Sequence, residues 1–75
     1  MDRIKVTEIV SLAARKFGIL EQHVFRGWSY EDWRAELIPD GSPSKRFFIR
    51  IPTHRRDELT LIFTVEAQIK ASMPN

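Results

Sequence analysis

Cysteine is absent from this chain of 75 residues, and glycine is scarce. Without cysteine the protein has no disulfide scaffold, no thiolate metal site and no thiol nucleophile. The three glycines, Gly18, Gly27 and Gly41, stand far apart, so there is no glycine-rich loop of the kind that holds phosphates. No stretch approaches the roughly 20 apolar residues that span a bilayer, and charged residues at positions 2, 3, 5 and 8 interrupt any secretory signal. We therefore expect a cytoplasmic protein with no membrane segment.

The composition is that of a folded domain with a slight excess of positive charge. Hydrophobic residues make up 43% and charged residues 29%, and 12 Lys and Arg against 10 Asp and Glu give a formal charge of +2. This balance permits nucleic acid as a partner without requiring it. A chain of this length forms a small domain with a thin core. We therefore expect residues 1–75 to be one domain without a cleft between lobes, and whether the chain is part of a longer protein stays open.

Apolar residues recur three and four positions apart between Lys5 and Phe17, which predicts an amphipathic helix. Gly18 follows at the position where a helix commonly ends in a left-handed residue. Two cations, Arg15 and Lys16, stand in the last turn, where the carbonyl end of the helix dipole favours positive charge. The apolar stripe consists of Val6, Ile9, Val10, Ala13 and Phe17, with Leu12 beside it.

The next segment, residues 19–30, fits either a second short helix or an extended segment over 23–28, and Gly27 indicates a break. Beyond it, residues 33–38 alternate in a way that predicts a strand. A cluster of turn-forming residues occupies 39–44. Residues 46–51 then alternate again, and Pro52 ends that strand because proline lacks the N–H needed in a ladder.

The clearest repeat in the chain lies between Leu59 and Ser72. All seven odd positions are apolar and six of the seven even positions are polar, which predicts a strand with one buried face. Residues 66–73 are largely good helix formers, so the strand prediction is firm only for 59–65 and a short terminal helix stays open as the alternative. The expected architecture is α+β: an N-terminal amphipathic helix packed on a three-stranded antiparallel β-meander, with or without a short C-terminal helix.

A basic segment predicts the functional surface. Between positions 45 and 56 there are five Lys and Arg residues, one histidine and no acid. In an extended strand Arg46, Phe48 and Arg50 point to one face, where an aromatic ring can stack on a base while arginines hold phosphates. Ordinary solvated arginines on an open sheet are the alternative. The candidate nucleic-acid-binding residues are Lys45, Arg46, Phe48, Arg50, Arg55 and Arg56, with Trp28 and Trp33 as stacking platforms.

Two resemblances to nucleic-acid-binding families bear on this reading. The run LAARKFGI, with Ala14, Gly18 and Val24 at helix-turn-helix spacing, resembles the first helix and turn of transposase-type or repressor-type DNA readers. That resemblance implies a second helix from Leu20, which would meet Gly27 after about two turns. An amphipathic helix ended by a capping glycine explains the same residues. The order of elements also resembles the double-stranded RNA-binding domain in outline. The lysine-rich second helix of that domain is missing here, because residues 66–73 contain a single lysine, Lys70.

Catalytic motifs are missing. The only histidines, His23 and His54, have no partner at metal-ligand spacing, and no serine stands in a nucleophile elbow. His54 with Asp57 or Glu58 could form an acid–base pair, but the adjacent arginines favour a cluster on a turn. We therefore predict a non-enzymatic protein with no metal and no small-molecule cofactor, which is nucleic-acid-binding or regulatory. The alternative is a protein–protein adaptor or inhibitor that binds its partner, or forms a homodimer, through the last strand at residues 59–71.

Overall fold

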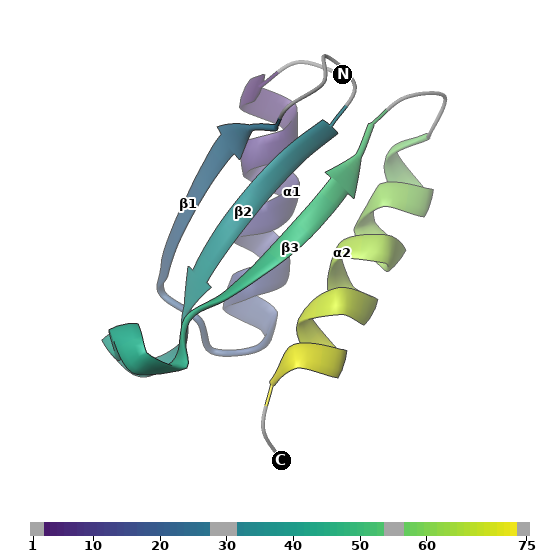
Figure 1. The fold of residues 1–75 in the computed structure, drawn as a ribbon. Helices are drawn as coiled ribbons and strands as arrows, with labels where there is room; N and C mark the ends of the chain where they lie inside the picture. Colours follow the sequence, from purple (N-terminus) through teal and green to yellow (C-terminus); the bar gives the residue numbers. More distant parts are fainter. Residues whose placement is uncertain (1–2, 28–31, 54–56, 74–75) are drawn as a thin grey trace.

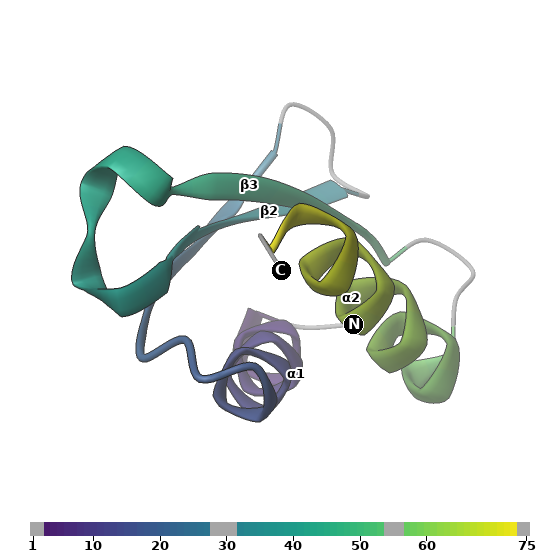
Figure 2. The same cartoon turned by 90° about the horizontal axis from the view of Figure 1, so that it is seen from below.

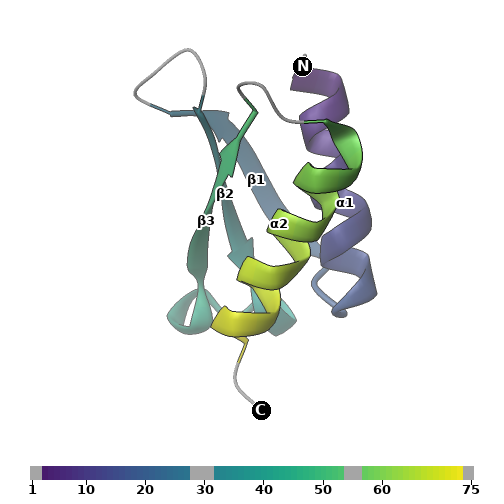
Figure 3. The same ribbon diagram turned by 90° about the vertical axis from the view of Figure 1, so that its right-hand side faces the viewer.

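The computed structural model describes residues 3–27, 32–53 and 57–73 (Figure 1). It is an α+β fold, as expected. Along the chain an N-terminal helix is followed by a three-stranded antiparallel sheet in the order β1-β2-β3 and then by a C-terminal helix. Both helices lie on the same face of the sheet, and the other face is open (Figures 2 and 3). The elements are α1 (Arg3–Lys16), β1 (Glu21–Arg26), β2 (Asp32–Ile38), β3 (Phe47–Pro52) and α2 (Glu58–Ser72), with two short 3₁₀ turns, Pro39–Gly41 and Pro43–Lys45, between β2 and β3.

The helix α1 confirms the prediction from the apolar stripe, and Gly18 follows its last turn as expected. The Gly18 N–H donates to the carbonyl of Arg15 (3.0 Å) and the Ile19 N–H donates to the carbonyl of Ala14 (2.8 Å), the hydrogen bonds of a Schellman motif. Gly18 has a φ of 76°. The helix buries Val6, Ile9, Val10, Ala13 and Ala14 against the sheet and α2.

Residues after Gly18 form a strand and not a second helix, so the helix-turn-helix interpretation is wrong. The extended alternative for this region is the one observed, because Glu21–Arg26 pairs along its whole length with β2. With β1 in the sheet, the outline of helix, three strands and helix agrees with the order expected from the RNA-binding-domain resemblance. The agreement stops at the order of elements, since acidic Asp57 and Glu58 stand at the start of α2 and a single lysine near its end.

The predicted last strand is wrong: residues 58–72 form the helix α2. Leu61, Val65 and Ile69 are spaced four apart, so a two-residue repeat and a helical repeat both bring them to one side. All three are fully buried in the helix, whereas Leu59 and Phe63, which have the same parity, are each 62% exposed. The Asp57 carboxylate starts the helix by accepting a hydrogen bond from the Thr60 N–H (2.7 Å). A homodimer built on a strand at 59–71 is therefore ruled out in this fold.

The register of the strands separates the side chains into two faces. Val24, Ala35 and Ile49 form one cross-strand row under the helices, and Arg26, Trp33 and Ile51 form another. Ala35 and Ile51 are fully buried, and Ile49 is almost so. The strands predicted at 33–38 and 46–51 are thus confirmed to within a residue.

No helix in the described ranges is long and apolar enough to cross a membrane.

Candidate nucleic-acid interface

The open face of the sheet carries two cross-strand rows of side chains. One row consists of Phe25 on β1, Arg34 on β2 and Arg50 on β3. The next consists of His23, Glu36 and Phe48 in the same strand order. We call these six residues the open face. They alternate along each strand with the residues that point to the helices, because successive side chains of a strand point to opposite sides.

Two phenylalanines are the apolar part of the open face. Phe25 is 40% exposed and Phe48 is 56% exposed. They lie two strands apart and two residues apart along the strands, which separates their Cα atoms by about 12 Å. Each exposed ring offers a flat surface on which a planar group such as a base can stack. Two such rings on a rigid sheet therefore form a platform with separate stacking positions.

Arginines lie next to both rings. Arg34 is beside Phe25 in its row and diagonal to Phe48, while Arg50 is two residues from Phe48 on β3. Both arginines are exposed, and together with Phe25 and Phe48 they line a shallow hollow of about 430 Å³. A guanidinium presents a planar fork of donors that matches a phosphate group. The hollow thus combines stacking surfaces with anion-binding groups.

Negative charge lies at the other end of the open face. Glu36 stands in the second row, and Glu21 lies 3.9 Å from the His23 Nε2. At the start of β3, Lys45 and Arg46 are exposed and add two cations beside the row that holds Phe48. The row of Phe25, Arg34 and Arg50 itself contains two cations and no acid, so a phosphate would meet the more favourable potential there.

The structure brings together part of the predicted site. Phe48 and Arg50 lie on the open face, with Lys45 and Arg46 exposed in the turn before them. Trp33 does not belong to it: its side chain points under the helices, only 8% of the residue is exposed, and the Arg26 guanidinium lies 6.0 Å from the ring centroid. The prediction of a stacking role for Trp33 is therefore withdrawn. Trp28, Arg55 and Arg56 lie outside the described residues.

The candidate residues chosen from the sequence do not include Phe25 and Arg34. Both become part of the open face only because β1 pairs with β2 in a register that places Phe25 opposite Arg34. The alternation of residues 33–38 indicated that Arg34 points away from Trp33, but it did not show which side would be covered. The interpretation of residues 23–28 as an extended segment was the sequence signal that could have placed Phe25 on a strand.

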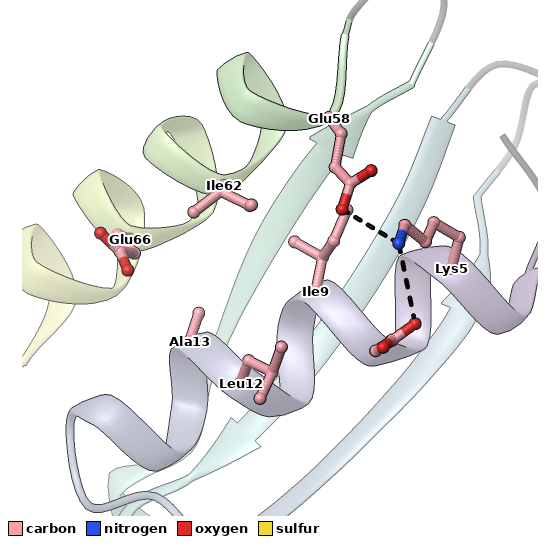
Figure 4. Close-up of a pocket in the computed structure, with 8 residues that line it drawn as sticks. Lys5, Ile9, Leu12, Ala13, Glu58, Ile62 and Glu66 are labelled. Carbon is pink, nitrogen blue, oxygen red and sulfur yellow. Dashed lines mark ion pairs between the residues drawn. The ribbon is translucent and has the colours of Figure 1, made fainter.

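A second hollow lies between the two helices, far from the open face (Figure 4). Its volume is about 160 Å³, and its walls are apolar side chains of both helices, among them Ile9, Ala13 and Ile62. The Lys5 Nζ bridges its rim, 3.0 Å from Glu58 Oε1 and 3.9 Å from a Glu8 oxygen. Glu66 lines the far end, and its carboxylate pairs with the Lys16 ammonium at 3.2 Å. Three carboxylates around an apolar hollow disfavour a phosphate, so we do not include this groove in the candidate interface.

Side chains that could ligate a metal do not cluster among the described residues. Within the ranges 3–27, 32–53 and 57–73 there is no group of three His, Asp or Glu side chains that could hold a metal ion. No polar or charged side chain among them is buried. The Asp57 pKa is lowered by the hydrogen bonds from Thr60, which accords with its role at the start of α2.

Comparisons with protein-family models, with curated proteins and with solved structures gave no match.

Proposed function

We propose that this protein binds single-stranded nucleic acid across the open face of its sheet and has no enzymatic role. The observation that carries the proposal is the row Phe25, Arg34 and Arg50 next to the exposed ring of Phe48. Bases stack on the two phenylalanines, and the arginines hold the phosphates between them. Stacking of this kind tolerates any sequence, because every base has a flat face.

Single strands fit this surface better than duplexes do. A duplex keeps its bases stacked on one another, so the rings of Phe25 and Phe48 would have nothing to stack on. A duplex can bind to a helix that carries lysines, but α2 begins with Asp57 and Glu58. Among the described residues, the exposed rings of Phe25 and Phe48 lie beside the exposed side chains of Arg34 and Arg50 on the open face.

The test is a binding titration with a fluorescein-labelled single strand of mixed sequence, followed by anisotropy at several salt concentrations. We expect the affinity to fall steeply with salt because phosphate contacts release counterions. Phe48→Ala should weaken binding by roughly 5- to 100-fold, the effect of losing one stacked base at about 1–3 kcal/mol. The matched control is Phe63→Ala, which removes an equally exposed ring from α2 and should leave the affinity unchanged.

A second pair of variants separates charge from stacking. The plot of log affinity against log salt has a negative slope. Arg34→Gln should make this slope shallower by about 0.7, the value for one phosphate contact on a single strand. Lys70→Gln removes an exposed cation from α2 and should not change the slope. No binding to single or double strands at low salt would overturn the proposal. Tighter binding to a duplex, unaffected by Phe48→Ala, would overturn the stacking mechanism.

A further inference from the structure

Among the six residues of the open face Glu36 is the only acid, and it lies beside the more exposed of the two rings. The N–H and carbonyl of Arg50 bond the side chain of Gln68 and therefore point away from β2. The main-chain groups of Phe48, two residues earlier on β3, point the same way. Glu36 and Phe48 thus face each other without hydrogen bonds between their main chains. In an antiparallel sheet the side chains of such a pair lie closest, with Cα atoms about 4.5 Å apart.

The carboxylate of Glu36 is available to a ligand. No hydrogen bond or ion pair joins it to another residue in the described ranges. His23 lies opposite Glu36 on β1, but its Nε2 lies 3.9 Å from an oxygen of Glu21. Glu36 is only half-buried, so its carboxylate can be reached from the open face.

A carboxylate on this face repels phosphate, so its contribution to binding must come from another part of the nucleic acid. A carboxylate accepts hydrogen bonds and donates none. Within a DNA strand the donors are the N–H groups of the bases. A purine is wider than the phenyl ring on which it stacks, so the edge of a purine on Phe48 reaches over the neighbouring Glu36. The position of Glu36 therefore suits an acceptor that reads the stacked base.

The four bases differ in the donors on the edge that a single strand leaves free. Guanine presents a ring N–H and an amino group side by side, which match the two oxygens of a carboxylate. Adenine and cytosine each present an amino group beside a ring nitrogen without hydrogen, and thymine presents one N–H between two carbonyls. In these three bases an acceptor lies next to the donor and would face the second carboxylate oxygen.

We infer, on the basis of the proposed function, that the base stacked on Phe48 is guanine and that Glu36 selects it. The ring N–H and amino group of guanine donate to the two carboxylate oxygens. The position on Phe25 differs, because Phe25 faces Arg34 and no carboxylate. That position accepts any base. The open face therefore prefers a single strand that contains guanine.

The test compares a short fluorescein-labelled oligothymidine with the same strand carrying one guanine at its centre. We expect the guanine strand to bind about fivefold to tenfold tighter, the low end of the range for a bidentate contact to a base, because the site is open to water. A central inosine keeps the ring N–H and lacks the amino group, so its affinity should lie between the two. A central adenine controls for the wider stacking surface of a purine and should gain less than guanine.

Glu36→Gln keeps the size of the side chain and replaces one acceptor oxygen by a donor. In this variant the guanine and adenine strands should bind within about twofold of each other, because the paired acceptors are gone. The affinity for oligothymidine should not fall, since a negative charge is removed. Glu21→Gln is the matched control: it removes an exposed carboxylate from β1, two strands away from Phe48, and should preserve the preference for guanine. Circular dichroism checks that both variants are folded.

Equal affinity for the guanine and adenine strands would overturn the inference, and so would a guanine preference that survives Glu36→Gln. An affinity that rises by the same factor for every strand in Glu36→Gln would show that Glu36 acts through its charge alone, which also overturns it. In each of these cases weaker binding by Phe48→Ala would leave the proposed function standing. Absence of binding to every strand would overturn the proposed function and the guanine preference together.

Discussion

The side-chain amide of Gln68 pairs with Arg50 as a neighbouring strand would. Its Oε1 accepts from the Arg50 N–H at 2.9 Å, and its Nε2 donates to the Arg50 carbonyl at 2.5 Å. A primary amide has the same donor and acceptor as a peptide unit, so one side chain of α2 satisfies both edge-directed groups of a β3 residue. This contact joins the last helix to the edge strand that carries Phe48 and Arg50.

Replacing Gln68 by methionine keeps the length of the side chain and removes both hydrogen bonds. We expect the Arg50 amide to exchange with solvent several-fold faster, and the free energy of unfolding to fall by about 1 kcal/mol. Hydrogen exchange followed by NMR measures the first, and urea denaturation the second. Lys70→Met is the control, since Lys70 is exposed on the same helix. An unchanged Arg50 amide would show that the bond does not persist in solution.

Leu59 and Leu61 distinguish the helix from the strand that the sequence predicts. In a strand both side chains would point to the same side, but in α2 Leu61 is fully buried and Leu59 is 62% exposed. We expect Leu61→Ala to lower the free energy of unfolding by about 3 kcal/mol, because it leaves a cavity in the core. Leu59→Ala should change it by less than about 0.5 kcal/mol. Equal losses in urea denaturation would contradict the helical assignment.

Gly18 ends α1 in a left-handed conformation that a side chain disfavours. Its φ is 76°, and a Cβ added there would meet nothing within 4 Å. The cost of Gly18→Ala is therefore conformational, about 1 kcal/mol. Gly18→Asn should cost less, since asparagine tolerates this region better. Thermal and urea unfolding of both variants measures the order, and an alanine variant as stable as the wild type would contradict the capping role.

Asp57 makes the stability of α2 depend on pH. Hydrogen bonds from Thr60 lower its pKa below the ordinary value of 3.8. The stabilisation from its carboxylate is therefore complete above pH 3.8 and is lost as the pH falls through the lower pKa of the folded state. Asp57→Asn retains an acceptor at the start of the helix but does not titrate.

The measurement is the difference in unfolding free energy between the wild type and Asp57→Asn. We expect the wild type to be the more stable of the two at about pH 6 and to lose this advantage progressively as the pH falls below 3.8, because the protonated carboxyl no longer accepts as a charged group. A difference that stays constant with pH would show that the charge of Asp57 does not contribute.

Local signals explain which parts of the fold could be predicted. The stripe of α1 contains three- and four-residue spacings that no strand reproduces, and Gly18 follows it directly, so the helix and its end needed no tertiary information. The alternation of apolar and polar residues in β3 and the cluster of turn-forming residues before it are local signals too, and they predicted the strand and the turn. Phe48 and Arg50 could therefore be assigned to one face in advance.

The structure of residues 58–72 and the choice of which face of the sheet is covered depended on contacts between distant segments. Leu61, Val65 and Ile69 satisfy both a two-residue and a helical repeat, and packing against the sheet and α1 selected the helix over the β-branched preference of this segment. The side of the sheet that the helices cover decided that Trp33 is buried and that Phe25 and Arg34 are exposed. By itself the sequence determined which residues share a face within an element, because that follows from backbone geometry. Only the tertiary structure decided which face is covered, because burial depends on what packs against it.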